Sequence, residues 1–181
     1  MTWPGNDVER LVAIEEIRQL AYDYAYAVNF RDAQLFRSLW VQTDVPTDPP
    51  VIDGHMAERF IANFGSAGPS ILFVSNHRIW FESGTDAAGT VYCQAQAVRD
   101  VGWVNQSIMY QDRYRLVEGR WLFVSRRHQL WFGQLCGENP LEQPPAKWPD
   151  SPIGRGTLPE DIESYRLFRA QSDGVDIPNA E

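Results

Sequence analysis

The sequence is poor in several kinds of residue, and each shortage excludes a class of protein. Two cysteines, Cys93 and Cys136, are too few for a disulfide scaffold or a thiolate zinc site. The three histidines lie far apart in the chain, so no metal site is expected. The Gly-x-Gly-x-x-Gly and P-loop patterns that hold nucleotide phosphates are absent, so no cofactor is expected either.

Positive charge is also scarce. The chain has 16 Lys and Arg against 24 Asp and Glu, which gives a net charge of −8. An acidic chain without a basic stripe has no electrostatic footprint for nucleic acid or anionic membrane, so neither is an expected partner. No apolar run approaches the ~20 residues that span a bilayer, and the N-terminal residues do not resemble a secretion signal. We therefore expect a cytoplasmic protein.

The residues that the sequence has in quantity are apolar and aromatic. Hydrophobic residues make up 44% of the 181 positions and aromatic residues 13%, including seven Trp. A chain of this length and composition can bury the core of one domain. The aromatic side chains fit two uses, a packed core or the lining of a cavity for a flat apolar ligand.

The first third of the chain has the apolar spacing of helices. Asn6 is followed three residues later by a glutamate, which matches a capping box, and apolar residues then recur every three or four positions as far as Val28. Asp32 is the expected N-cap of a short second helix. A third helix is predicted over residues 56–64.

After residue 70 the pattern changes to the β-branched and aromatic runs that are typical of strands. No helical segment separates these runs, so they should pair as an antiparallel meander. Turn signals lie between them, of which Glu118-Gly119 is a tight hairpin signature. The four predicted strands cover residues 71–81, 90–101, 103–117 and 120–132, and the first predicted turn covers 84–89.

This order of elements predicts an α+β domain, with N-terminal helices packed on one face of a curved antiparallel sheet. We expect the domain to cover residues 1–132. A proline-rich C-terminal extension over residues 133–181 keeps one helical patch around Tyr165 and Phe168. The extension is expected to pack on the domain or on a neighbouring subunit.

Three segments resemble the SnoaL-like domains of the nuclear transport factor 2-like superfamily, in particular its scytalone dehydratase-like branch. They are IEEIRQLAYDYAYAVNFRDAQLFRSLW at 14–40, SNHRIWF at 75–81 and YQDRYRLVEGRWLFVSRR at 110–127, and the resemblance spans about residues 8–132. It implies a cone-shaped domain around one hydrophobic pocket for an apolar small molecule. It also implies a homo-oligomer, dimer or trimer, with Trp80 or Trp103 as candidate contacts on an exposed sheet face.

Dehydratase members of this superfamily carry an Asp–His pair that removes a proton from the substrate, and both positions differ here. The Asp position falls on Asn29 and the His position on Leu72. An amide cannot stabilise an imidazolium charge, and leucine has no proton chemistry. Shifting the alignment to use His77 would need five residues, and an odd shift turns a strand side chain to the other face. The family mechanism is therefore not expected.

Other polar residues are candidates for a site. The resemblance places Tyr24 and Tyr110 at the pocket, and it matches Arg126 to an arginine that contacts the leaving group in the dehydrochlorinase. By strand alternation, His128 shares a face with Arg126, and Asp112 shares one with Tyr110. If the hairpin turn makes these two faces coincide, Asp112 lies across from Arg126 and Tyr110 across from His128. A one-residue change in the turn would separate them.

Two functions remain open. In the first, the chain is a cofactor-independent lyase or isomerase for an apolar cyclic substrate such as a steroid, polyketide or aromatic compound. His128 would be the base, Arg126 would face a developing negative charge, and Tyr110 would orient the substrate. The expected ligand-binding residues are Tyr24, Asn29, Leu72 and Asp112. In the second, the replaced dyad leaves a non-catalytic ligand-binding or structural subunit, like the β subunits of ring-hydroxylating dioxygenases.

Overall fold

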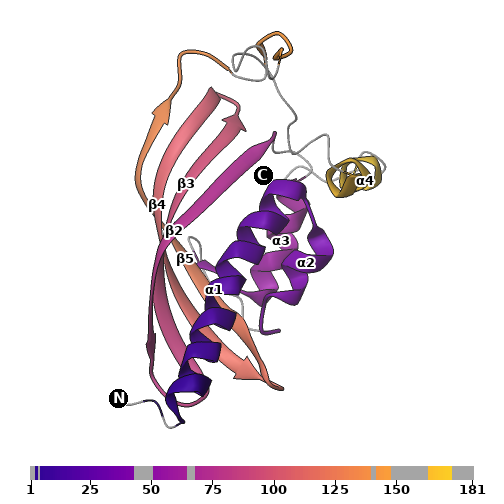
Figure 1. The fold of residues 1–181 in the computed structure, drawn as a ribbon. Helices are drawn as coiled ribbons and strands as arrows, with labels where there is room; N and C mark the ends of the chain where they lie inside the picture. The colour runs from indigo at the N-terminus through magenta and orange to yellow at the C-terminus, as the bar shows by residue number, and fades with distance from the viewer. Residues whose placement is uncertain are drawn as a thin grey trace.

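The computed structural model describes residues 3, 5–42, 51–64, 68–139, 142–147 and 163–172. Its architecture is the predicted α+β arrangement, in which helices from the N-terminal third lie on one side of a five-stranded antiparallel sheet that curves around them (Figure 1). No helix in this part of the chain is long and apolar enough to cross a membrane.

The three predicted N-terminal helices are confirmed, together with the residues that start them. The side chain of Asn6 accepts a hydrogen bond from the Glu9 backbone N–H, and the Glu9 carboxylate accepts one from the Asn6 N–H, which completes the capping box. Asp32 caps the second helix in the same way, by accepting from Leu35 N at 2.9 Å. The helices are α1 (Asp7–Phe30), α2 (Ala33–Ser38) and α3 (Gly54–Phe64).

Arg31 ends α1 and joins three parts of the molecule. Its backbone is left-handed (φ 56°), and its guanidinium is buried. The guanidinium donates to the Val28 carbonyl at the end of α1 and to Ser70 Oγ at the start of β2 (Ser70–Phe81). The ring of Tyr165, on α4 (Glu163–Ser172), lies 5.2 Å from the same guanidinium. One buried cation thus satisfies a helix terminus and ties it to the sheet and the C-terminal helix.

The sheet follows the predicted meander with three differences. Its order is β1-β5-β4-β3-β2, and the two-residue strand β1 has no counterpart in the prediction. The first turn is shorter than predicted, because the Glu82 N–H already bonds the Asp86 carbonyl, so β3 begins four residues early. The last strand extends three residues beyond the predicted end. The remaining bounds are β1 (Val51–Ile52), β3 (Asp86–Arg99), β4 (Gly102–Val117) and β5 (Arg120–Leu135).

The hairpin between β4 and β5 fixes their register. Glu118 and Gly119 both have positive φ, 50° and 79°, as a two-residue type I′ turn requires. The strands then pair from Val117 with Arg120 onward, with irregularities between Arg113 and Tyr114 and between Ser107 and Ile108. Because side chains alternate along a strand, this register decides which residues share the face toward α1, called here the inner face.

A β-bulge at Asn76 divides β2 into two phases. Ser75 pairs with Tyr92 and His77 with Val91, so one extra residue lies between them. An extra residue shifts the alternation by one, so His77 lies on the same inner face as Leu72 despite their odd separation. The argument that an odd separation would turn His77 to the other face is therefore wrong.

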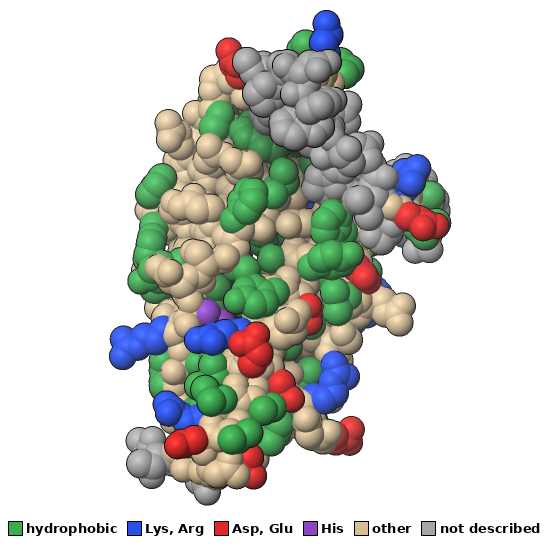
Figure 2. All heavy atoms as spheres, in the orientation of Figure 1, with side chains coloured by type: hydrophobic (Ala, Val, Ile, Leu, Met, Phe, Trp, Pro, Cys, Tyr) green, Lys and Arg blue, Asp and Glu red, His purple; other side chains and the backbone are tan. Residues whose placement is uncertain are grey.

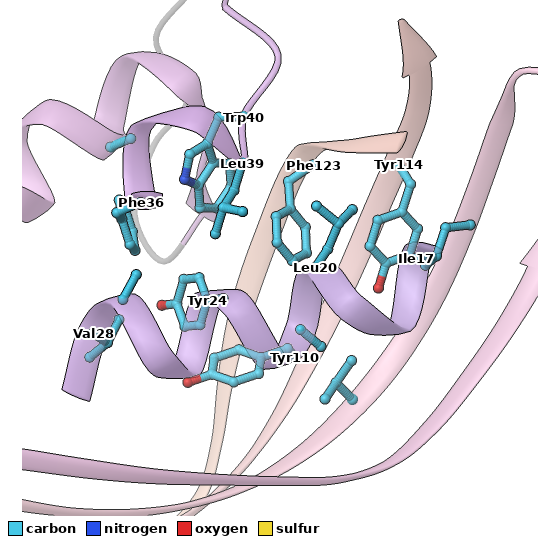
Figure 3. Packing of buried hydrophobic residues seen from close by; sticks show 14 of the residues in the cluster. Ile17, Leu20, Tyr24, Val28, Phe36, Leu39, Trp40, Tyr110, Tyr114 and Phe123 are labelled. Carbon is cyan, nitrogen blue, oxygen red and sulfur yellow. The ribbon is translucent and has the colours of Figure 1, made fainter. Parts of the chain in front are cut away.

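The core lies between α1 and the inner face. Tyr24 of α1 is surrounded by rings from α2, β4 and β5, and the side chains of Phe36 and Phe123 are completely buried (Figure 3). Trp40, just beyond α2, packs on Phe123 with their ring centres 5.0 Å apart. Burial of these large rings supplies most of the hydrophobic stabilisation of the domain.

Replacing Phe123 with alanine should lower the free energy of unfolding by about 3–5 kcal/mol, because it opens a cavity in the core that the surrounding side chains cannot fill. The matched control is Leu11→Ala on α1, where the side chain is 64% exposed and the change should be within about 0.5 kcal/mol. Urea unfolding monitored by circular dichroism measures both values. Similar losses in the two variants would contradict this view of the core.

Candidate functional site

The register of the β4–β5 hairpin brings the predicted polar residues together. Tyr110 pairs with His128, and Asp112 pairs with Arg126, as required for the two faces to coincide. Arg126 points inward and has no exposed surface, whereas Arg127 is exposed on the outer face. The hairpin turn thus satisfies the condition that the sequence left open.

The centre of this group is a buried ion pair. Arg126 Nε donates to Asp112 Oδ1 at 2.8 Å, and Nη2 donates to Oδ2 at 2.7 Å, while both side chains are fully buried. Burial alone would lower the pKa of Arg126, but the Asp112 carboxylate raises this pKa above its ordinary value. Two parallel charge-assisted hydrogen bonds offset much of the desolvation of the two charges and lock their relative orientation.

Two further residues extend the pair into a row of hydrogen bonds. Tyr114 Oη donates to Asp112 Oδ2 at 2.7 Å, and its oxygen lies 3.0 Å from His77 Nε2. Because the tyrosine has given its one proton to the carboxylate, the histidine must be the donor, with its proton on Nε2. Gly89 faces this row on β3, and a Cβ there would lie 3.2 Å from the Tyr114 hydroxyl. A glycine at this position gives the hydroxyl room to reach Asp112.

His77 is held in the neutral form at neutral pH. Burial lowers its pKa to about 4, and the nearby Asp112 carboxylate raises the pKa by too little to compensate. Its Nδ1 is buried and has no hydrogen-bond partner among the residues that the structure describes, so a second ring proton would find no acceptor. His77 therefore acts as a donor to Tyr114 and is a poor base at neutral pH.

Aromatic rings cover the guanidinium of Arg126. Its central carbon lies 4.3 Å from the ring centre of Tyr24, 4.2 Å from that of Tyr110 and 4.5 Å from that of Phe123. Such stacking stabilises a desolvated cation. Within the described residues, Nη1 of Arg126 is left without a hydrogen-bond partner.

The hydroxyl groups of Tyr24 and Tyr110 point in one direction. Both are directed toward Val28, at the C-terminal end of α1, and their rings make an edge contact at 5.8 Å (Figure 3). Burial raises the pKa of Tyr24 to about 12 and the pKa of Tyr110 well above its ordinary value, although Arg126 lowers both. Both phenols are therefore neutral hydrogen-bond donors at physiological pH.

Asn29 and Leu72, the positions of the family dyad, contact each other directly. Leu72 N donates to Asn29 Oδ1 at 2.8 Å, and Asn29 Nδ2 donates to the Leu72 carbonyl at 3.4 Å. An amide satisfies both groups of the β2 backbone, whereas a carboxylate would repel the carbonyl oxygen. The Asn29 side chain therefore links α1 to the backbone of β2.

His128 lies where the enclosed interior meets solvent. It is half-buried, and its ring makes an edge contact with the Tyr110 ring at 5.5 Å between centres. Leu130, the next inner-face residue of β5, is 49% exposed. Among the predicted site residues on the sheet, His128 is thus the ionisable group that a ligand at this end of the domain reaches first.

Two open hollows in the described part of the chain lie elsewhere. They have volumes of about 530 and 360 Å³, share Trp3, and border the first turns of α1. None of the predicted site residues lines them.

Sequence reasoning missed His77 and Tyr114 as members of the polar row. The alternation of 110, 112 and 114 along β4 was a signal for Tyr114, whereas the bulge at Asn76 left no visible signal for His77. Trp103, a suggested subunit contact, is only 5% exposed and is ruled out as a surface contact, whereas Trp80 is exposed.

Removing one member of the ion pair should cost much more than removing both. Arg126→Met leaves Asp112 as an uncompensated buried charge, and we expect a loss of about 3–5 kcal/mol in the free energy of unfolding. The double variant Asp112→Leu/Arg126→Met should recover at least about 1 kcal/mol of this loss. Denaturant unfolding of the single and double variants tests the point, and equal losses would contradict it.

The depressed pKa of His77 predicts a pH-dependent stability. Between the ordinary histidine pKa, near 6.5, and the folded value of about 4, only the unfolded state takes up a proton, so stability falls as pH is lowered through this window. The contribution is complete above pH 6.5. In His77→Gln this part of the pH dependence should disappear, whereas His55→Gln, on α3, should keep it. Unfolding midpoints measured from pH 8 to 4.5 distinguish these outcomes.

Comparisons with solved structures agree with the fold described above. Hexachlorocyclohexane dehydrochlorinase LinA-type3 from Novosphingobium barchaimii LL02 superposes with a TM-score of 0.67 at 19% identity, covering 74% of this chain and 97% of that one. A scytalone dehydratase-like protein from Novosphingobium aromaticivorans DSM 12444 gives 0.62 at 19% identity, covering 76% and 99%. At such identities the likeness concerns the fold.

No curated protein sequence matches the chain. A family model does, and it is the model of the SnoaL-like domain, which matches residues 9–127. This match covers more than half of the chain and includes α1 from Glu9 onward, the bulged strand β2 and the β4–β5 hairpin as far as Arg127. The chain belongs to the SnoaL-like domain family.

Proposed function

We propose that the protein binds an apolar cyclic small molecule on the inner face of the sheet, toward the Val28 end of α1, and acts on it as a cofactor-independent lyase or isomerase. His128 is the general base in this proposal. The observation that carries it is the strand register, which sets His128 beside Tyr110 on the same face as the buried Asp112–Arg126 pair.

The two tyrosines supply the polar part of the binding site. Neutral hydroxyls that point in one direction suit a carbonyl oxygen, or the oxyanion that forms when a proton is removed next to it. Arg126 lies against both rings and offsets part of the rise that burial causes in the pKa of both phenols. In this arrangement Arg126 acts mainly through Tyr24 and Tyr110, since two of its nitrogens already bond Asp112.

The base is assigned to His128 by position and chemistry. Histidine is the side chain whose ordinary pKa lies nearest neutrality, as proton abstraction requires. The other histidine on this face, His77, is already committed as a donor to Tyr114 and has a pKa of about 4. Apolar neighbours at the site, Leu72, Ile108 and Leu130, fit an apolar ring rather than a charged ligand.

Family membership supports the substrate class. SnoaL-like domains typically bind small molecules, and the structural neighbours include a dehydrochlorinase and a dehydratase by name. Both names describe eliminations, in which the substrate loses a proton and a leaving group. The replaced dyad means that the base in this chain comes from β5 instead of β2.

The second candidate function is ligand binding without catalysis. The observation that favours it is the Asn29–Leu72 contact, in which the positions of the family base and its carboxylate serve the backbone. In that case the same face binds the ligand, and no proton moves.

The experiment measures binding and proton transfer separately. A panel of steroid, terpenoid and aromatic ketones is screened by thermal shift, and the hits are incubated in D₂O while exchange at the acidic C–H is followed by NMR. We expect His128→Gln to reduce exchange by about 10²-fold or more while binding stays within about threefold. The matched control, His55→Gln on α3, should exchange at the wild-type rate.

Each outcome assigns the function. Binding without exchange in the wild-type protein supports the non-catalytic candidate. Unchanged exchange in His128→Gln removes His128 as the base.

A further inference from the structure

The last strand, β5, forms an edge of the sheet that is only partly covered. Strand β1 pairs with it at Arg126 and Arg127, and the backbone of Leu39 and Val41 bonds it at Phe123. From Gln129 to Leu135 it pairs with β4 alone in the part of the chain that the structure describes. This stretch, called here the open edge, is seven residues long.

The open edge has one irregularity, the extra residue Trp131 between Leu130 and Phe132, but it lacks the charged residues and prolines by which natural proteins protect such strands. All seven of its residues are exposed, and they include a phenylalanine at 59% and a tryptophan at 49%. Its sequence, QLWFGQL, contains no charge and no proline. A long exposed edge strand with apolar side chains on both faces is a template for pairing with another strand.

The neighbouring surface has the same character. Tyr92 and Trp131 pack ring against ring at 4.9 Å on the face away from α1, with exposed Phe73 nearby on β2. The polar residues among them are amides and hydroxyls, such as Gln94, which donates to Ser107 at 2.8 Å. We call this surface, together with the open edge, the uncharged patch.

Charge on the outer face is confined to the other half of the sheet. Figure 2 shows basic and acidic side chains over the lower part of the molecule, with a few more at its top and beside α4, while the visible surface of the upper part of the sheet is mostly hydrophobic or uncharged. The outer-face arginines of the lower half are Arg78, Arg113, Arg115 and Arg127. Depletion of charge with enrichment of aromatic residues is the composition of an interface core.

The uncharged composition of the patch is compatible with a second copy of this chain as the occupant. Two chains that each carry −8 repel each other except where their facing surfaces are neutral, and the uncharged patch is such a surface. A charged partner would find no opposite charge there to steer it. Glutamine and asparagine side chains both donate and accept hydrogen bonds, so the patch is complementary to itself.

We infer that a second copy of this chain docks antiparallel along Gln129–Leu135, so that the two sheets continue into each other around a two-fold axis. An isologous contact of this kind uses each residue twice. The backbone groups of the open edge gain partners, and the exposed rings of Trp131 and Phe132 become covered.

Light scattering during size-exclusion chromatography tests the inference directly. The wild-type protein should have twice the mass of the 20.7 kDa chain. Phe132→Glu and Trp131→Glu should each weaken association at least tenfold and shift the protein toward the monomer. Leu11→Glu, on the exposed face of α1, makes the same change outside the patch and should leave the dimer intact.

A second measurement does not depend on the variants folding well. In the wild-type protein, backbone amides within Gln129–Leu135 should exchange with deuterium more slowly at high protein concentration and faster on dilution. A monomeric wild-type protein, a dimer that persists in both glutamate variants, or exchange that does not depend on concentration would overturn the inference. A trimeric mass would overturn the two-fold pairing.

Discussion

The buried ion pair between Asp112 and Arg126 organises the inner face of this domain. Asp112 accepts from Arg126 with both oxygens and from Tyr114 with one of them, so every other member of the site is placed with respect to it. Arg126 in turn carries the rings of Tyr24 and Tyr110 against its faces. A charge pair in a dry interior has few alternative arrangements, because any displacement exposes an unsatisfied charge to a low dielectric.

The ion pair also lies between two sets of polar groups on the inner face. On the Asp112 side of the pair, the hydrogen-bonded row runs through Tyr114 to a neutral His77. On the Arg126 side lie the buried phenols of Tyr24 and Tyr110, followed by the half-buried His128. The strongest electrostatic interactions therefore hold the inner face in place, and in the proposed function the groups that act on a ligand are weak acids and a histidine. Such a division suits reactions on apolar molecules, in which little charge is present until the proton moves.

The sequence predicted the elements well and the site in part. Helix caps at Asn6 and Asp32 and the turn at Glu118-Gly119 depend on local chemistry, so they were visible in the sequence, and the turn made the pairing of Asp112 with Arg126 predictable as a condition. The strand β1 is two residues long and lacks a pattern. His77 was missed because a bulge depends on the partner strand, which no single-strand periodicity reports.

The bulge at Asn76 also divides β2 into two halves whose inward-facing residues are set separately. One extra residue exchanges the inner and outer side chains on one side of it and leaves the other side untouched. The rule that every second residue of β2 faces inward therefore has to be counted separately before and after Asn76. Gain or loss of a single residue at this point would turn the outward-facing side chains of half of β2 toward the interior. None of those residues would need to be substituted, so one insertion or deletion could change the set of inward-facing groups on this strand.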